Sequence, residues 1–345
     1  MTLRAAIIGC GRVAWMLEDD PLETKPCTHM GAYGSVDGVE VVCAADTDAA
    51  RLAAFGARYG VGALYDDYRR MLRMERPDVV SICAWATDRA AMVMEAIDAG
   101  VRGIWCEKAM AASLDEARAM ADAAGRAGVV MIVSHMRRWC PRYRKAKEMI
   151  EGGVIGRLQS IVAHFSGSLL HTGTHAFDVL RWFAGEARWV EGALEERGGR
   201  AFEWELADDR GGRAVIGFDD GVYATVHGES KGYFFFEFDV IGSHGRIRIG
   251  NNDVLRLYRP APSRHYTGLL ELDGAPFPGF EERNIWTAAL EDLIGCMRGE
   301  AENPSGPEDG LRALEMALGV HVSHGLGGAR VELPLEVTGA RVASR

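Results

Sequence analysis

Residues 4–14, RAAIIGCGRVA, contain the motif from which the rest of the chain can be interpreted. The first five residues are a short run typical of a buried parallel strand, and the next six read G-x-G-x-x-A. Gly9 permits a tight turn from strand to helix, Gly11 lets a pyrophosphate approach the backbone, and Ala14 lets the helix pack closely on the strand. The N–H groups at the start of that helix would face the phosphates. Because glycine-rich turns follow strands in many α/β proteins, the motif alone only suggests a dinucleotide site.

A matching acidic residue follows the next predicted strand. That strand covers 39–45 and ends at Asp46, whose carboxylate can accept hydrogen bonds from the adenosine ribose. Asp46 lies 32 residues beyond Ala14, more than the roughly 20 expected. Residues 15–27 explain the excess, because they hold two prolines and an acidic triplet, cannot be continuous helix, and precede a resumed helical pattern at 29–33. Without these 13 residues the spacing falls to 19.

The two signals together predict dinucleotide binding. Asp46 favours NAD over NADP, because a carboxylate repels a 2′-phosphate. A second role for Asp46, as the cap of the helix that follows, is compatible with ribose binding.

Length and composition limit the class of protein. A chain of 345 residues suits two domains, and 48% hydrophobic and 26% charged residues are ordinary for a soluble globular protein. The formal charge of −10 argues against a nucleic-acid partner, because phosphate binding needs a basic surface. No apolar run approaches the roughly 18 residues of a membrane span. The nucleotide strand begins at the N-terminus, so we expect no signal peptide.

The cysteines indicate the redox environment. Their positions are 10, 27, 43, 83, 106, 140 and 296. They are scattered, lie largely in apolar strands and form no C-x-x-C pair. We expect reduced core residues of a cytoplasmic protein rather than a disulfide framework or a zinc site.

One basic stretch departs from the acidic balance. Six basic residues crowd into 137–147: Arg137, Arg138, Arg142, Arg144, Lys145 and Lys147. A solvated helix face is one reading, and a site for a small anion or the cofactor phosphates is the other.

The first 134 residues alternate between helix and strand patterns. Helices are predicted at 48–59, 68–75, 87–99 and 113–128, and strands at 63–65, 78–84, 103–106 and 129–133. Continuous apolar strands separated by helices predict a doubly wound parallel sheet covered on both faces. Residues 1–134 are therefore expected to form a Rossmann dinucleotide-binding domain.

Residues 135–345 have longer, alternating strands. After a basic helix ending near Gly152, strands are predicted at 158–166, 215–218, 223–228, 233–241 and 245–249, and helices at 172–183, 281–297 and 307–326. Short turns at 219–221 and 242–245 predict hairpins, and 260–280, rich in Pro and Gly, is predicted to be one long loop. We expect a largely antiparallel sheet with helices on one face.

Two groups of residues can carry chemistry. Glu107 and Lys108 follow strand 103–106, at the carboxyl edge where open parallel sheets bind ligands. His171 and His175 have the i, i+4 spacing of one helical face, provided the helix begins early enough.

The histidines suit proton transfer better than metal binding. A metal would need a third ligand, and with His164 the spacing H-x6-H-x3-H matches no zinc site, so no metal is predicted. A packing role remains the plain alternative. A histidine acting as general acid or base suits alcohol or ketone chemistry, because imidazole titrates near neutrality.

The motifs occur in the order found in the Gfo/Idh/MocA oxidoreductases, which the chain resembles over nearly its whole length. They are the G-x-G-x-x-A turn, Glu107-Lys108, Arg137-Arg138-Trp139-x-Pro141 followed by Gly153-Val154-Ile155-Gly156, and Gly173-Thr174-His175-x-x-Asp178.

The resemblance implies an α/β protein, with an N-terminal Rossmann doubly wound parallel sheet and a C-terminal α+β domain (135–345) with a large, mostly antiparallel open sheet for substrate binding and oligomerisation. It also implies a homo-oligomer, a dimer or tetramer. The family's catalytic lysine corresponds to Lys108 and its histidine to His175. Substrate would be oriented by Arg137, His171 and Asp178. We expect the cofactor at Gly9, Gly11, Arg12, Val13, Asp46, Glu107 and Lys108.

Three departures from the family pattern bear on function. The usual E-K-P is Glu107-Lys108-Ala109, and His171 replaces the aspartate that inositol-dehydrogenase-like members carry, which argues against a simple inositol dehydrogenase. The insertion at 15–27 is extra, and we expect it to wall the substrate pocket rather than serve only as a surface loop.

The leading interpretation is an NAD-dependent oxidoreductase that transfers a hydride between nicotinamide and a secondary alcohol or ketone of a sugar, cyclitol or related polyol. The alternatives are reduction of an imine or conjugated double bond, redox-assisted glycoside cleavage, and a non-catalytic NAD(P)-binding regulator. The presence of both Lys108 and His175 disfavours the regulator, since a sensor needs neither.

Overall fold

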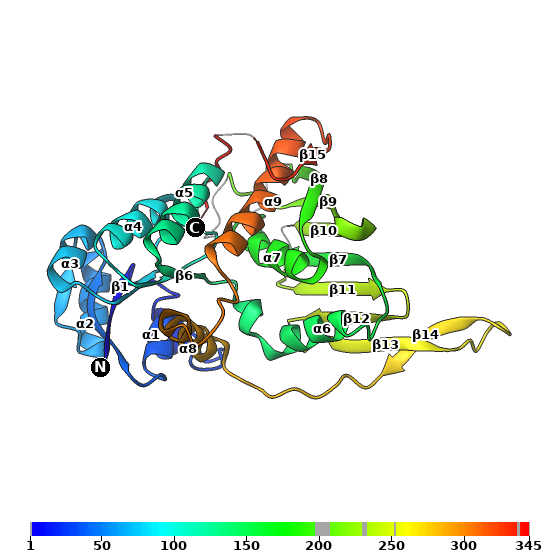
Figure 1. The fold of residues 1–345 in the computed structure, drawn as a ribbon, viewed down its shortest axis with the longest axis horizontal. Coiled ribbons are helices and arrows are strands. Elements are labelled where there is room, and N and C mark those ends of the chain that lie inside the picture. The colour runs from blue at the N-terminus through cyan, green and yellow to red at the C-terminus, as the bar shows by residue number, and fades with distance from the viewer. Residues whose placement is uncertain (1, 197–207, 230–232, 252, 337–338, 345) are drawn as a thin grey trace. The chain divides into compact units, whose positions relative to one another are not determined.

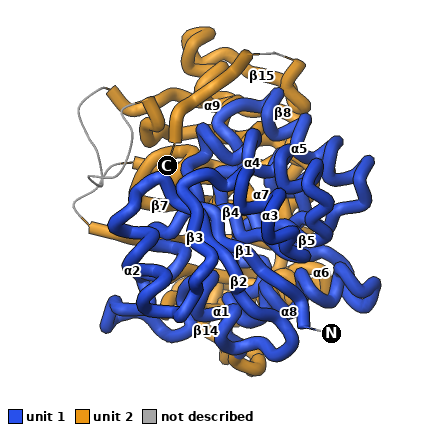
Figure 2. The backbone as a smooth tube through the Cα atoms, turned by 90° about the vertical axis from the view of Figure 1, so that its left-hand side faces the viewer, with its two compact units in different colours: residues 1–139, 283–311, 345 blue, residues 140–282, 312–344 orange. Residues whose placement is uncertain are grey.

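A computed structural model describes residues 2–196, 208–229, 233–251, 253–336 and 339–344. The chain divides into two compact units, coloured separately in Figure 2. The first unit contains 1–139 and 283–311, and the second contains 140–282 and 312–344. This division differs from the predicted boundary at 134/135 in one important respect, because a late segment of the chain returns to the first unit.

The first unit is built on a six-stranded parallel sheet of order β3-β2-β1-β4-β5-β6. Its strands are β1 (Leu3–Ile8), β2 (Val39–Ala45), β3 (Ala63–Tyr65), β4 (Val79–Ile82), β5 (Gly103–Cys106) and β6 (Val130–Val133). Every residue of β4 and β5 is buried, as expected for a sheet covered on both faces. The predicted doubly wound Rossmann sheet is confirmed.

Helices cover both faces of this sheet. They are α1 (His29–Tyr33), α2 (Ala49–Tyr59), α3 (Tyr68–Glu75), α4 (Ala86–Asp98), α5 (Leu114–Ala127) and α8 (Ile285–Arg298), with the short 3-10 turns η1 (Met16–Asp19) and η2 (Met136–Trp139). In Figure 1, α4 and α5 lie on one side of the sheet and α1 and α8 on the other. Ser113 caps α5 by accepting a hydrogen bond from the N–H of Glu116, as its sequence predicts.

Helix α8 explains why the chain returns to the first unit. It packs against α1, β5 and β6, and Asn284 caps it by accepting hydrogen bonds from two backbone N–H groups. The same Asn284 donates to the carbonyl of Pro26 at 2.8 Å. Trp286 packs on Trp105 of β5, with ring centroids 5.9 Å apart. The sequence predicts a helix here but gives no sign of which sheet it covers.

The segment after the glycine turn corrects one prediction. Residues 12–15 form turns rather than the start of a helix, and the first α-helix begins at His29. The backbone N–H groups of His29 and Met30 donate to the carbonyls of Val13 and Ala14 at 3.2 and 2.9 Å. Helix α1 therefore continues the turn as though the insertion were absent, which confirms that the extra residues are a local excursion.

The second unit contains a nine-stranded sheet of order β14-β13-β12-β11-β7-β10-β9-β8-β15. Its strands are β7 (Leu158–Ser166), β8 (Ala187–Leu194), β9 (Gly212–Phe218), β10 (Tyr223–Glu229), β11 (Phe236–Gly242), β12 (Gly245–Gly250), β13 (Leu255–Pro262), β14 (Leu270–Ala275) and β15 (Val331–Glu332). Among the described strands of this second sheet, β7 and β10 form the one parallel pair. The hairpins β9–β10 and β11–β12 are antiparallel at the two predicted turns.

Alternation along the strands separates the two faces of this sheet. In β7, Ile161, Ala163 and Phe165 are fully buried, whereas Val162 and His164 between them are half-buried. Helix α7 (Gly173–Ala184) packs on β7 and α6 (Pro141–Glu151) on β12, and α9 (Pro307–Gly325) follows later in the chain. No helix within the described ranges has the length and apolar character needed to cross a membrane.

The prediction of one long loop at 260–280 is wrong, because β13 and β14 form a hairpin within this range. On its β13 side, strand β12 pairs only with residues 255–258. Pro260 and Pro262 therefore lie where β13 is bonded to β14 alone in the described chain. A proline is tolerated at such an edge because its missing N–H breaks no ladder. Proline content read without this context misassigned the segment.

Candidate active site

The glycine turn at the carboxyl end of β1 is open to a ligand. Gly9 has a φ of +89°, and a Cβ there would lie 3.0 Å from the carbonyl carbon of Cys83. Only glycine fits this turn without strain. Around Gly11 the nearest atom to an added Cβ is a guanidinium nitrogen of Arg51 at 3.8 Å. The backbone at Gly11 is therefore exposed to an approaching phosphate.

Asp46 is fixed beside this turn. One of its carboxylate oxygens accepts a hydrogen bond of 2.7 Å from the N–H of Cys10, and the other accepts one of 2.8 Å from the N–H of Asp48. Asp48, not Asp46, caps α2 by accepting from two backbone N–H groups. The alternative interpretation of Asp46 as the cap of this helix is therefore wrong. Arg51 pairs with Asp48 at 2.9 Å and lies 3.6 Å from Asp46.

The turn and the carboxylate together fit a dinucleotide. The open backbone at Gly11 suits a pyrophosphate, and the carboxylate at the end of β2 suits ribose hydroxyls. Within the same turn Arg12 is exposed and Val13 is half-buried. The N–H groups available here belong to a turn rather than to a regular helix start, which is the one departure from the expected arrangement.

Glu107 and Lys108 occupy the carboxyl end of β5. Glu107 is 5% exposed, and Lys108 is half-buried. The N–H of Lys108 donates to one carboxylate oxygen of Glu107 at 3.3 Å, and Nε2 of His29 lies 3.2 Å from the other. Burial raises the pKa of Glu107, but the hydrogen bond and charge of His29, with the charges of Lys108 and Arg89, outweigh burial and lower the pKa to about 2. Glu107 is therefore ionised at neutral pH.

Arg89 supports the next residue of this corner. It lies in the first turn of α4, is 3% exposed, and donates through Nη1 to the carbonyl of Ala109. The Lys108–Ala109 peptide bond is cis. Burial lowers the pKa of Arg89 from its ordinary value.

A buried chain of polar groups extends inward from Glu107. Nδ1 of His29 lies 3.0 Å from the hydroxyl of Ser81, which lies 2.9 Å from the hydroxyl of Tyr33. Because ionised Glu107 can only accept, Nε2 of His29 must carry a proton. Sequence reasoning placed His29 on the cofactor side but missed its contact with Glu107, and it missed Ser81 and Tyr33, because isolated polar residues in apolar elements give no sign of their partners.

In the second unit the predicted histidines lie around the start of α7. His171 precedes the helix, which begins at Gly173, so the expected shared helical face with His175 does not form. His175 lies in the first turn, half-buried, with its ring edge-on to Phe236 at a centroid distance of 6.5 Å. Asp178, three residues further, is 1% exposed. His175 and Asp178 therefore share a face of α7.

Asp209 anchors the turn that leads into α7. It is 4% exposed and accepts hydrogen bonds of 2.9 Å from the N–H groups of Leu170 and His171. The hydroxyls of Ser168 and Ser344 donate to it at 2.9 and 2.7 Å. Burial raises the pKa of Asp209 to about 6 despite these four donors, each of which lowers it. Nothing in the sequence around Asp209 indicates this role.

His164 lies apart from the α7 histidines. It is on β7 and stacks on His227 of β10, with ring centroids 4.8 Å apart. His164 and Phe165 point to opposite faces of the sheet, because they are neighbours on one strand. Phe165 is on the face that contacts Gly173 of α7. Across the described residues no group of three His, Cys, Asp or Glu side chains is placed to hold a metal ion.

The basic stretch is largely engaged in ion pairs. Arg137 is half-buried in η2. Four neighbours pair with carboxylates: Arg138 with Asp309, Arg142 with Asp253, Lys145 with Glu148, and Lys147 with Glu151. Of the six basic residues only Arg144 is exposed, so ion pairs rather than solvent account for most of the charges in this stretch.

Family models match both halves of the chain. Residues 3–135 match the oxidoreductase family with an NAD-binding Rossmann fold, GFO_IDH_MocA, and residues 165–248 match the GFO/IDH/MocA C-terminal domain.

Curated relatives are similar over most of their length. D-apiose dehydrogenase of Paraburkholderia graminis is 26% identical, with 93% of this chain and 87% of that protein covered. The NAD(+) scyllo-inositol 2-dehydrogenase of Bacillus subtilis is 24% identical, with 86% of each covered.

A solved structure shares the fold. The WlbA dehydrogenase of Bordetella pertussis, solved with NADH and UDP-GlcNAcA, has a TM-score of 0.78 and 20% identity, with 97% of this chain and 100% of that chain covered. The two family models, the Rossmann sheet and the glycine turn beside Asp46 agree with one another. The chain therefore belongs to the Gfo/Idh/MocA family of NAD-dependent oxidoreductases.

Proposed function

We propose that this protein is a dehydrogenase that transfers a hydride between the nicotinamide of NAD and a secondary alcohol, or the corresponding ketone, of a sugar, cyclitol or related polyol. The observation that carries the proposal is the position of Lys108, half-buried at the carboxyl end of the inner parallel strand β5 beside an ionised Glu107. Open α/β sheets bind their ligands at this edge. The similarity to D-apiose and scyllo-inositol dehydrogenases supports the substrate class.

The proposed reaction divides the work between two side chains. NAD supplies the hydride acceptor when bound. His175 removes the proton of the substrate hydroxyl, and Lys108 hydrogen-bonds to the same oxygen and stabilises its developing negative charge. Arg137, His171 and Asp178 orient the substrate. An ionised Glu107 next to Lys108 favours the ammonium form of that lysine, which is the form that donates.

Cofactor binding is assigned to the first unit. In the proposal Gly9, Gly11, Arg12 and Val13 surround the pyrophosphate, and Asp46 accepts from the adenosine ribose. Glu107 and Lys108 lie toward the nicotinamide.

A substrate panel tests the proposal. The full chain is mixed with NAD and, separately, D-apiose, scyllo-inositol, myo-inositol and simple D-glucosides, and the absorbance of NADH is followed. At least one polyol should give a saturable rate that Lys108→Ala abolishes. NAD binding without turnover on any polyol would support the regulator instead. NADH oxidation by imines or conjugated ketones, with no polyol oxidation, would support the reductase.

Two further features complete the proposal. We expect a homo-oligomer, a dimer or tetramer, which light scattering of the purified chain would reveal. We also expect a cytoplasmic location, which fractionation of the producing cell would test.

A further inference from the structure

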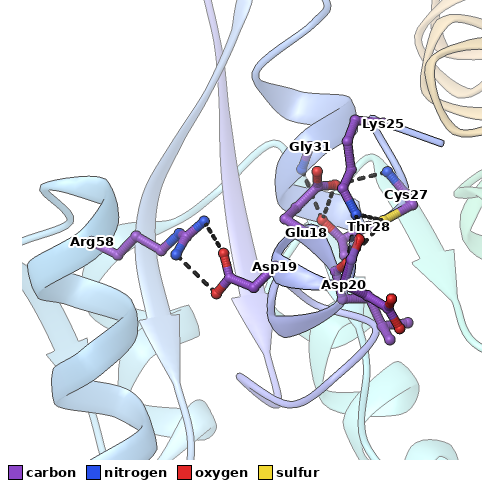
Figure 3. Close-up of polar contacts among 9 residues, drawn as sticks. Glu18, Asp19, Asp20, Lys25, Cys27, Thr28, Gly31 and Arg58 are labelled. Atoms are coloured by element: carbon purple, nitrogen blue, oxygen red, sulfur yellow. Dashed lines mark hydrogen bonds and ion pairs between the residues drawn. The ribbon is translucent and has the colours of Figure 1, made fainter. Parts of the chain in front are cut away.

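The insertion at 15–27 forms a network of hydrogen bonds with the residues at the start of α1 (Figure 3). One carboxylate oxygen of Glu18 accepts hydrogen bonds of 2.8 Å from both the N–H of Cys27 and the hydroxyl of Thr28. Thr28 in turn caps α1 by accepting from the N–H of Gly31 at 3.0 Å. A Cβ on Gly31 would collide with the same Glu18 oxygen. The insertion therefore fixes the residue immediately before His29.

His29 is held on all sides within the first unit. It is fully buried, and its ring lies 4.1 Å from the ring of Trp105 and 5.5 Å from that of Trp286, measured between centroids. Its two ring nitrogens reach Ser81 and Glu107. A histidine in this setting has no freedom to rotate, so it presents Nε2 to Glu107 in one direction.

The two oxygens of Glu107 are held from different directions. His29 from α1 contacts one, and the N–H of Lys108 contacts the other. The ionisable groups around Glu107 are His29, Arg89 of α4, Lys108, and the thiols of Cys83 and Cys106. Arg89 is bonded to the carbonyl of Ala109. His29 is therefore the side chain whose hydrogen bond sets the orientation of this carboxylate.

We infer that His29 is a positioning residue for the proposed reaction: it fixes the Glu107 carboxylate beside Lys108, and Glu18 of the insertion keeps His29 in place. The inference rests on the catalytic role proposed for Lys108. On this inference the insertion helps to hold Glu107 and Lys108 in position within the first unit.

Substitutions at His29 separate positioning from packing. His29→Leu keeps much of the volume but removes the donor, whereas His29→Gln keeps an N–H donor at a similar reach. Tyr33→Phe is the matched control, because it removes a hydroxyl from the far end of the same chain and leaves the bond between His29 and Glu107 intact. Binding of NADH, followed by tryptophan fluorescence, verifies that each variant is folded.

Two measurements on the full chain decide the outcome. The first labels the lysine amines by reductive methylation with carbon-13 formaldehyde and titrates their NMR signals without cofactor. The sequence has five lysines, and Lys108→Arg identifies the signal of Lys108. In His29→Leu this signal should titrate at lower pH than in the wild type, because a displaced carboxylate no longer stabilises the ammonium. His29→Gln and Tyr33→Phe should match the wild type.

The second measurement is kinetic and uses NAD with the polyol that the panel identifies. His29→Leu should lower kcat by about tenfold to a hundredfold while KM for NAD changes by about twofold or less. His29→Gln should restore most of kcat. If His29→Leu does not fold, His29→Asn replaces it, because its amide is too short to reach Glu107.

The outcomes are distinct. A folded His29→Leu variant with an unchanged Lys108 titration, or equal losses in His29→Leu and His29→Gln, would overturn the inference. A shifted titration with no turnover on any polyol in the wild type would support positioning by His29 and refute the proposed function.

Discussion

The Nε atom of Arg51 lies 3.6 Å from a carboxylate oxygen of Asp46 at the mouth of the glycine turn. The Arg51 side chain is 41% exposed and pairs more closely, at 2.9 Å, with Asp48. The guanidinium of Arg51 therefore lies beside the carboxylate of Asp46, which we propose binds the adenosine ribose. In the proposed site Asp46 repels a 2′-phosphate, while Arg51, of the residue type that binds such a phosphate, lies beside it.

Replacing Asp46 should therefore change cofactor preference. Asp46→Ser removes the repulsion and leaves Arg51 to pair with the 2′-phosphate, so the ratio of NADPH to NADH affinity should rise by about tenfold or more. Fluorescence titration with both cofactors measures the ratio. The double variant Asp46→Ser/Arg51→Ala should gain less, and an equal gain would exclude Arg51 from the effect. Tighter binding of NADP than NAD by the wild type would contradict the role of Asp46.

Lys108 should matter for chemistry and little for cofactor affinity. Lys108→Ala should lower kcat by about a hundredfold or more, because it loses a charged donor to the developing oxyanion. NAD affinity should stay close to the wild-type value. Lys145→Ala is the matched control, since Lys145 pairs with Glu148 on the surface of α6. Turnover near the wild-type rate in Lys108→Ala would remove this lysine from the mechanism.

His175 should leave a signature in the pH profile. If it accepts the substrate proton, kcat/KM for oxidation should fall as pH drops below neutrality, because an imidazolium cannot accept a proton. His175→Asn should be slow and should lose this ionisation while the fold and NAD binding persist. His171→Asn serves as the comparison, because His171 lies in the turn before the helix. An unchanged acid limb in His175→Asn would assign that ionisation to another group.

The insertion offers a test of its own. Replacing Trp15 to Pro26 with a short Gly-Ser linker should raise KM for the substrate more than it alters NAD affinity. The linker also removes Glu18. The variant Glu18→Gln therefore shows how much of any change in kcat comes from weakening the hydrogen bonds of Glu18 at the start of α1. Asp19→Asn is the control, because the pair of Asp19 with Arg58 is exposed to solvent, where an ion pair contributes little to stability (Figure 3). Wild-type values of both constants in the linker variant would refute a role in substrate binding.

Asp209 makes stability depend on pH with a definite sign. Its pKa is raised from 3.8 to about 6 in the folded chain, so the native state holds a proton that the unfolded chain has released. The free energy of unfolding therefore falls as pH rises from about 4 to 6. In urea titrations the advantage of the wild type over Asp209→Asn should shrink across this window by about 3 kcal/mol. A constant difference between the two proteins would show that burial does not shift this carboxyl.

Local patterns specify most elements of the fold. The helix Tyr68–Glu75 and the strands Gly103–Cys106 and Leu158–Ser166 have the predicted bounds. Caps, apolar periodicity and strand length are properties of neighbouring residues, so they can be read directly. The hairpin at Pro260 and Pro262 could not be read this way, because whether a proline is tolerated depends on which strand lies beside it.

Long-range pairing accounts for the remaining differences. His29 and Glu107 are 78 positions apart, and no periodicity connects them. Asp209 meets Ser168 across 41 positions in the same way. The sequence therefore indicates the positions of Lys108, His175 and Asp46, which end strands or carry motifs. It does not indicate the buried side chains that support them, because tertiary packing selects those partners.

The late arrival of α8 affects how the protein emerges from the ribosome. The six strands of the first sheet are complete at Val133, but Trp105 and His29 lack their Trp286 neighbour until α8 has been translated. At about 5–20 residues per second, synthesis from Val133 to Arg298 takes roughly 10–30 s. During that interval the apolar surface that α8 later covers is exposed on the nascent Rossmann unit. A chaperone that binds stalled chains of this length should therefore bind at this surface.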